Sequence, residues 1–307
     1  MSVTLIATVV ALVLGHIAPS LAASLRQYGW YGDWLRWLDT RFAEGSFWRG
    51  RWGIAIALLP PLLLVAMFQS ALDEPLLGLA GLLFSIAVLF YTWGPRDLDV
   101  DVDAILDAPD PLARRDAAAR LWPRNGTVSI ESGALAEAVF RSALQRWFGV
   151  LFWFLLLGPL GAVLYRLTQL ATDGIPDDDV PTRGLPLETQ RGARTLRAIL
   201  EWPVAQLMTL ALALVGNFDS VLGAWRTAGG GSFRLDTRFL GAVARASVTS
   251  ELAEEAADYA DGGDTTAVAV LPFSDLPGLR DAMSLVWRSL LVWLATLALF
   301  VIAGFVN

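Results

Sequence analysis

Two arginines stand at the two ends of a long uncharged stretch of this sequence. Residues 147–165 carry no charge, and Arg146 and Arg166 flank them. The planar guanidinium of arginine bonds both oxygens of a carboxylate or phosphate, so an arginine in apolar surroundings suits the binding of an anion. Gly158-Pro159 interrupts the stretch, and proline removes a backbone donor and clashes with the preceding helical turn. If the chain folds back at this break, both arginines face one cavity.

Two glutamates are candidate partners of these arginines. Glu137 precedes the stretch, and Glu201 follows it, just before the next apolar run. An arginine in a low-dielectric place is costly unless a carboxylate or an anionic ligand holds it. The ligand-binding residues that this reasoning predicts are Glu137, Arg146, Arg166 and Glu201. The alternative is a kinked helix packed inside a bundle, in which Gly158 and Gly161 allow close approach of a neighbouring helix.

The other chemistry-bearing residues form no catalytic or metal-binding pattern. Cysteine is absent and His16 is the single histidine, which leaves no thiolate site, no Ser-His-Asp triad and no ordinary zinc site. The acidic run 97–110 fails a calcium-loop template that starts at Asp99, because Ala104 replaces the glycine and Asp110 replaces the glutamate. We expect no catalytic residue and no metal site, and the motifs identify no cofactor. A net charge of −7 argues against nucleic acid as a partner.

Long apolar helices must position these groups. The chain has 307 residues, 55% of them hydrophobic, and the apolar residues gather in runs that match a hydrocarbon core of about 30 Å. Uncharged runs of this length lie at 3–25, 53–72, 75–95 and 289–306. Residues 147–165 form a fifth run, and a sixth at 203–218 is too short to span comfortably. We predict an all-α fold, a polytopic helical membrane protein with four to six transmembrane or re-entrant helices. Residues 265–273 are a weak strand candidate.

The arginines set the expected topology. Segments 26–51 and 96–146 are rich in arginine and are separated by two crossings, so both face one side, which positive-inside bias makes the cytoplasm. Residues 147–218 must then cross an even number of times or dip in and return. The polar segment 219–284 is expected on the cytoplasmic side, within a single membrane domain of residues 1–307. The tryptophans interpreted as interfacial anchors are Trp30, Trp34, Trp37, Trp48, Trp52, Trp93 and Trp147.

Several stretches resemble one family, in order along nearly the whole chain. They read LLFSIAVLFYTWGPRDLDVDVDAIL, LGPLGAVLYRL, LEWPVAQL and GLRDAMSLVWRSLLVWL. Together they resemble AmpE, a family of inner-membrane proteins associated with the regulation of β-lactamase expression. The resemblance implies a multi-pass protein of the bacterial inner membrane.

AmpE proteins are in turn similar to the CobD/CbiB membrane amide synthases of cobalamin biosynthesis. Residues 164–166 match the LYR of those proteins, and Glu137 falls near their glutamate. This resemblance adds Tyr165 to the candidate ligand-binding residues. Gln206 stands where the IPARL motif has arginine, residues 168–170 depart from the NTLD part, and the PHP-type and SPNAG-type motifs are absent. The chemistry of the synthases is therefore not carried over.

These observations favour a non-catalytic membrane sensor or signalling modulator, linked by the resemblance to β-lactamase regulation and cell-wall status. One alternative is a membrane-embedded amide synthase or ligase-like enzyme related to CobD/CbiB. A second is a transporter or lipid-handling protein that uses the broken helix as a path. The expected partners are membrane lipids, an anionic small-molecule ligand and a regulatory protein.

Overall fold

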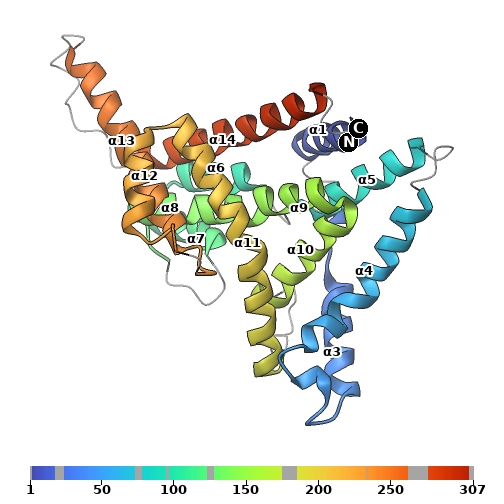
Figure 1. The fold of residues 1–307 in the computed structure, drawn as a ribbon. Helices are drawn as coiled ribbons and strands as arrows, with labels where there is room; N and C mark the ends of the chain where they lie inside the picture. Colours follow the sequence, from blue (N-terminus) through green and yellow to red (C-terminus); the bar gives the residue numbers. More distant parts are fainter. Residues whose placement is uncertain are drawn as a thin grey trace. The chain divides into compact units, whose positions relative to one another are not determined.

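The computed structural model describes residues 2–17, 24–72, 78–94, 97–122, 128–174, 185–232, 234–261 and 276–303, and every regular element in these ranges is helical (Figure 1). The α-helices are α1 (Ser2–Ile17), α3 (Gly29–Arg41), α4 (Gly53–Leu72), α5 (Gly78–Thr92), α6 (Leu98–Leu106), α7 (Pro111–Ala118), α8 (Ser132–Ala143), α9 (Gly149–Leu157), α10 (Pro159–Asp173), α11 (Leu187–Val215), α12 (Phe218–Thr227), α13 (Arg238–Asp261) and α14 (Pro277–Ile302). Short 3-10 helices lie at Phe47–Arg49 and Ala119–Leu121, and a π-helix at Leu144–Phe148.

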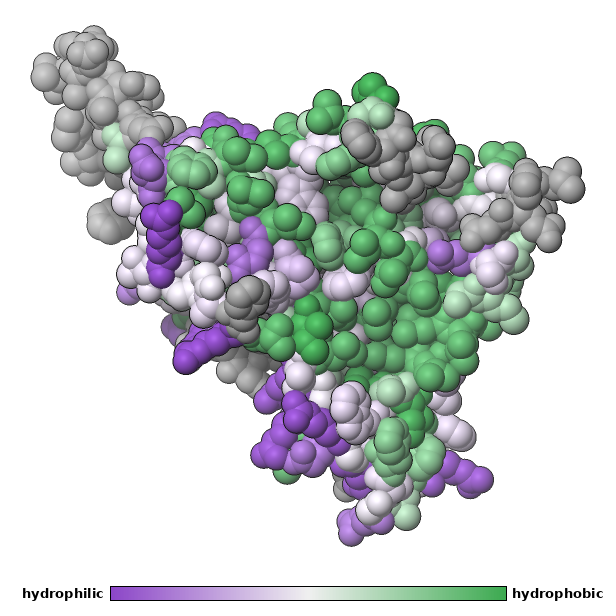
Figure 2. Space-filling model, in the orientation of Figure 1, coloured by the Kyte–Doolittle hydropathy of each residue, from purple (hydrophilic) through white to green (hydrophobic). Residues whose placement is uncertain are grey.

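The chain is an all-α helical membrane protein, which confirms the fold class that the hydropathy pattern predicts. Helices long and apolar enough to cross a membrane are Gly53–Leu72, Leu187–Val215 and Pro277–Phe300, and shorter apolar helices are Leu5–Gly15 and Gly78–Thr92. On α4 the large apolar side chains of Leu59, Leu63 and Leu64 are more than half exposed, as a lipid-facing surface requires. Figure 2 shows apolar residues gathered over α4, α5 and α9, whereas polar residues gather near α3 and the first turns of α11.

Some apolar runs give helices of unexpected length. Most of the run 203–218 forms the second part of α11, which begins at Leu187, ends at Val215 and has 29 residues. The whole helix is long and apolar enough to cross a membrane, so the length expected for this helix was too short. Its length was misjudged because charged residues precede the apolar part of the same helix. The run 75–95 gives α5, which has only 15 residues. The strand candidate 265–273 and the side chain of His16 lie outside the described residues.

The chain forms two compact units, which are described separately. The first unit comprises residues 1–95, 145–201 and 298–307. Its core joins Tyr31, Leu35 and Leu38 of α3 to residues of α4, α10 and the start of α11, and it includes Trp48. Trp48 is fully buried, and Thr189 of α11 donates a hydrogen bond from its hydroxyl to the Trp48 carbonyl.

Three tryptophans of the first unit lie inside the protein. Trp48, Trp93 and Trp147 are 0%, 7% and 2% exposed, so the interpretation of these three as interfacial anchors was wrong. Trp93 and Trp147 stack on each other with their ring centroids 6.5 Å apart. The indoles pack in the core because helices converge on them from segments that are distant in the sequence.

The second unit comprises residues 96–144 and 202–297. Helix α13 packs against α8 and α12, and Gly241 permits the close approach to α8, since a Cβ atom at this position would lie 2.5 Å from Cδ of Glu137. Part of the acidic run caps α7, where the Asp110 carboxylate accepts a hydrogen bond from the Ala113 amide at 2.8 Å. In the part of the chain that the structure describes, no group of three or more His, Cys, Asp or Glu residues is arranged to hold a metal ion.

Candidate functional site

The uncharged stretch folds into a hairpin of two short helices, α9 and α10. Gly158 lies between them with φ of 67° and ψ of −153°, a conformation that glycine adopts without steric cost. Pro159 is the first residue of α10, where its missing N–H is not needed. At a rise of about 1.5 Å per residue, α9 is about 14 Å long and α10 about 22 Å. Neither helix reaches across a hydrocarbon core of about 30 Å.

Two glycines bring the helices of the hairpin together. A Cβ atom at Gly149, the first residue of α9, would lie 2.2 Å from Cζ of Tyr165 in α10. Near the other end, a Cβ atom at Gly161 would lie 2.0 Å from the Trp153 carbonyl oxygen. The start of α9 therefore meets the middle of α10, and the second half of the stretch folds back on the first. This is the geometry on which the predicted anion site depends.

The tip of the hairpin is held by Gln69 of α4. Its side-chain nitrogen donates to the Leu157 carbonyl at 3.4 Å, and its side-chain oxygen accepts from the Leu160 amide at 3.1 Å. Helix ends carry backbone groups without intrahelical partners, and lipid offers none. The protein itself therefore covers the break at Gly158-Pro159.

Arg166 holds the base of the hairpin. Its side chain is 1% exposed. Nε donates to the carbonyl oxygen of Thr92 at 2.7 Å, and Nη2 lies 3.5 Å from the carbonyl oxygen of Arg146. Nη1 donates to the side-chain oxygen of Gln169. Among the described residues, these hydrogen-bond partners of the Arg166 guanidinium are neutral, and two of them are backbone carbonyls at the end of α5 and in the π-helix.

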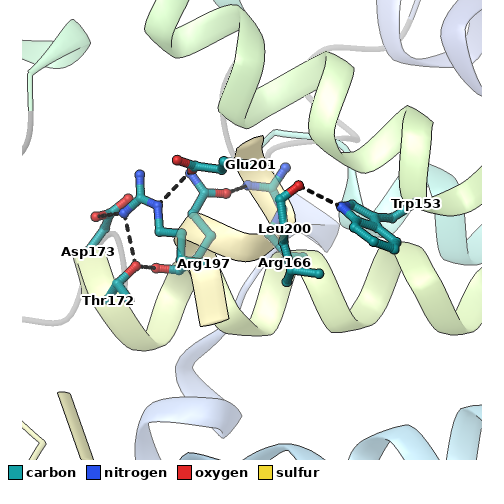
Figure 3. A network of polar contacts seen from close by, with 8 residues as sticks. Trp153, Arg166, Thr172, Asp173, Arg197, Leu200 and Glu201 are labelled. Carbon is teal, nitrogen blue, oxygen red and sulfur yellow. Dashed lines mark hydrogen bonds and ion pairs between the residues drawn. The ribbon is translucent and has the colours of Figure 1, made fainter. Parts of the chain in front are cut away.

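An ionic cluster lies beside Arg166, between α10 and α11, and Arg197 is its centre (Figure 3). Nε of Arg197 lies 2.7 Å from the Glu201 carboxylate, one helical turn further along α11. Nη1 donates to the Thr172 hydroxyl at 2.9 Å and forms an ion pair with Asp173, both on α10. Figure 3 shows Arg197 between Glu201 on one side and these two residues on the other. The cluster thus joins the hairpin to α11.

The ionic cluster continues into the interior of the hairpin. Tyr165 is buried and its side chain is hydrogen-bonded to Glu201. The side chains of Glu201, Arg197 and Asp173 are 8%, 17% and 32% exposed, so solvent access increases from Glu201 outward to Asp173. The Trp153 indole donates to the Leu200 carbonyl at 3.1 Å and adds a second link between hairpin and α11. A molecule that approaches from Asp173 would meet Arg197 before Glu201.

The predicted ligand-binding residues divide between the two units. Tyr165, Arg166 and Glu201 lie around the base of the hairpin, and Arg146 takes part through its backbone carbonyl. Glu137 belongs to the second unit, where it forms ion pairs with Arg141 at 2.6 Å and with Arg245. A ligand-binding role for these residues stays a prediction.

Sequence reasoning missed three residues that organise the site. Arg197 and Asp173 form the ionic cluster, and Gln69 closes the tip of the hairpin. Arg197 precedes Glu201 by four residues, the spacing of an ion pair on one helical face, and this signal was available in the sequence. Gln69 gave no local signal, because only the tertiary fold brings it to the break.

The fold and the site define a helical membrane protein built around a broken-helix hairpin. No family model and no solved structure matches the chain significantly. The chain is 29% identical over 198 residues to the cobalamin biosynthesis protein CobD of Stutzerimonas stutzeri (strain A1501), and the alignment covers 60% of each chain. This chain is thus distantly similar to a CobD protein, in agreement with the second resemblance found in the sequence. The resemblance to AmpE stays a prediction.

Proposed function

We propose that this chain is a non-catalytic membrane sensor or signalling modulator that binds an anionic small molecule at the ionic cluster of Arg197, Glu201 and Asp173. The observation that carries the proposal is the concentration of ion pairs between a short hairpin and a helix long enough to span. Buried charged groups are costly unless they are paired, and the side chain of Glu201 is only 8% exposed. Distant similarity to CobD supports a scaffold that binds a small molecule.

The arrangement suggests how binding is converted into a response. Arg197 holds Glu201 on its own helix and Asp173 on the hairpin. A ligand carboxylate or phosphate that takes the Arg197 guanidinium would displace Asp173, the more exposed carboxylate. Because this ion pair links α10 to α11, its loss lets the hairpin shift relative to the start of α11. Binding of the anion would thus change the packing between α10 and α11.

Substitutions in the ionic cluster test this function. Arg197→Gln and Asp173→Asn should either abolish the response or make it independent of the ligand, while the protein stays in the membrane. Arg191→Gln is the matched control, because Arg191 lies on the same helix and its side chain is 69% exposed.

We propose, from the AmpE resemblance, that the output is β-lactamase regulation through a regulatory protein partner. Induction of β-lactamase, measured together with membrane abundance in the host, is the readout. Normal induction in both cluster variants at normal abundance would refute the proposal.

The similarity to CobD favours one alternative, a membrane-embedded amide synthase or ligase-like enzyme. Expression of this chain in a strain that lacks its own CobD protein separates the two functions. The sensor proposal expects no restoration of cobalamin-dependent growth, even when the chain is abundant in the membrane. Restored growth, lost again in Glu201→Gln but kept in Arg191→Gln, would establish the enzyme instead.

A further inference from the structure

Helix α3 carries a row of aromatic side chains beside its core-facing residues, and of these Trp34 is partly buried against the core. Its core-facing residues Tyr31, Leu35 and Leu38 recur at helical spacing and are buried. Trp30, Trp34, Trp37 and Arg41 recur at the same spacing on the adjacent side of the helix. These four residues are named here the tryptophan face. Trp30 is 46% exposed and Trp37 is 52% exposed.

The tryptophan face is held in a fixed orientation. The Trp30 indole donates to the Tyr91 hydroxyl at 2.8 Å, and the Trp34 indole donates to the Ala57 carbonyl at 3.1 Å. Trp34 and Trp37 stack with their ring centroids 5.2 Å apart and an angle of 12° between the rings. Just before α3, burial raises the pKa of Tyr28 to about 12. Its neutral hydroxyl donates to the Tyr91 carbonyl at 2.5 Å, which fixes the start of the helix.

The exposed aromatic surface continues toward the apolar side of α4. Phe47 and Trp52 lie in the segment between α3 and α4 and are 60% and 70% exposed. The exposed leucines of α4 follow within two turns, beginning at Leu59. In Figure 2 the polar end of this unit near α3 passes directly into the apolar surface over α4. Tryptophan is enriched where lipid tails give way to headgroups, and this surface lies at such a transition.

The charges of this surface match an anionic membrane. Arg41 is exposed at the end of the tryptophan face, and the described residues include no ion-pair partner for it. Arg51 is exposed and its Nη2 lies 3.5 Å from the Thr195 hydroxyl, a neutral group. The nearby Arg36 and Arg49 are paired with acids, at 2.5 Å and 3.4 Å. The exposed Glu44 of the same segment offsets one of these two charges, so Arg41 and Arg51 leave a small net positive charge. Long arginine side chains reach from an apolar surface to the headgroup layer.

We propose that the tryptophan face, together with Phe47, Arg51 and Trp52, binds the headgroup layer of a bilayer that contains anionic phospholipid. The indole rings lie at the depth of the upper acyl chains, and Arg41 and Arg51 bond phosphate oxygens of the headgroups. Basic residues near an anionic leaflet each contribute about 1 kcal/mol. This site is independent of the ionic cluster at the hairpin, and it holds α3 at a defined depth.

Single-cysteine labelling of the full chain tests the depth of α3. The chain contains no cysteine, so Trp37→Cys and Thr40→Cys each give one labelling position, the second on the charged side of the same helix. Each variant carries an environment-sensitive fluorophore in nanodiscs of phosphatidylcholine, with or without phosphatidylglycerol. The label at position 37 should be quenched by spin-labelled lipid and protected from iodide, and the label at position 40 should behave in the opposite way. Equal iodide access at both positions would overturn the proposal.

Retention of lipid by the purified protein tests the part played by charge. The variant Arg41→Gln/Arg51→Gln should lose affinity for phosphatidylglycerol by about fivefold per arginine in native mass spectrometry, with phosphatidylcholine retention unchanged. The matched control is Arg226→Gln/Arg238→Gln, which removes two exposed arginines of the second unit. Equal losses in the two double variants, or no loss in the first, would refute headgroup binding by this surface.

Discussion

The side-chain oxygen of Gln69 accepts a hydrogen bond from the backbone amide of Leu160 at 3.1 Å, across the break between α9 and α10. Gln69 belongs to α4, a helix of spanning length whose surface is otherwise largely apolar. One polar side chain on this helix thus replaces the water that a soluble protein would supply to the ends of α9 and α10. The hairpin and α4 depend on each other for this reason.

The first prediction concerns Gln69→Leu, which keeps the size of the side chain and removes both hydrogen bonds. Two backbone groups at the tip of the hairpin lose their partner, and each costs about 1–3 kcal/mol when left unsatisfied. The variant should therefore unfold at a lower temperature than the wild type in the same nanodiscs. Ser70→Ala is the control, because the Ser70 hydroxyl bonds only within its own helix. Equal melting of Gln69→Leu and wild type would show that the tip needs no such partner.

The second prediction concerns Gly149→Ala. A methyl group here would lie 2.2–2.5 Å from ring atoms of Tyr165, so either the ring or the hairpin must move. We expect a loss of about 1–3 kcal/mol in unfolding free energy, the range that overpacked cores typically show.

Gly78→Ala is the matched control for Gly149→Ala. Gly78 begins α5, and no atom lies within 4 Å of the place that an alanine methyl group would take there, so alanine should be neutral or slightly stabilising. The two variants are compared by thermal unfolding in nanodiscs. A Gly149→Ala protein as stable as Gly78→Ala would mean that α9 and α10 do not pack as described.

A third prediction concerns topology and rests on the positive-inside bias of the sequence. Cysteines introduced at the exposed positions Glu44 and Ser132 should resist an impermeant thiol reagent in intact cells and react after permeabilisation. Asp73→Cys is the control, because Asp73 follows the first of the two expected crossings and should react in intact cells. Labelling at both Glu44→Cys and Ser132→Cys without permeabilisation would reverse the assignment.

Much of the fold could be predicted from the sequence, because long apolar runs determine where helices form and proline and glycine determine where they break. The all-α membrane class follows from the runs, and the break at Gly158-Pro159 follows from the missing donor of proline. The full length of α11 was missed because its first turns are charged and its apolar part was considered alone. Burial of Trp48 was also missed. A tryptophan near the end of an apolar run has the same neighbours in the sequence whether it packs in a protein core or lies at the membrane interface.

The candidate site could be predicted only in part. Arg166 and Glu201 stood out because a charge beside an apolar run is conspicuous, and both lie at the base of the hairpin. The hydrogen-bond partners of Arg166 were not accessible, because they depend on how the hairpin packs against the end of α5. Glu201 pairs with Arg197 on its own helix, and Arg166 bonds to backbone carbonyls. An arginine can be satisfied by carbonyls at helix ends as well as by a carboxylate, and sequence patterns do not separate these outcomes.

The last prediction concerns Arg166 and decides between a structural and a ligand-binding role. Arg166→Gln leaves the Thr92 and Arg146 carbonyls without their donor in a buried place. Hydrogen bonds to charged groups contribute about 1.5–3 kcal/mol each, so the variant should lose about 3–6 kcal/mol and its membrane abundance should fall. Arg166→Lys keeps the charge but not the fork of donors, and it should recover only part of the stability. Arg191→Gln, an exposed arginine of α11, should leave melting and abundance unchanged. If Arg166→Gln instead keeps its melting temperature and abundance but loses the signal, Arg166 binds the anion directly, and its contacts with the two carbonyls contribute little to folding.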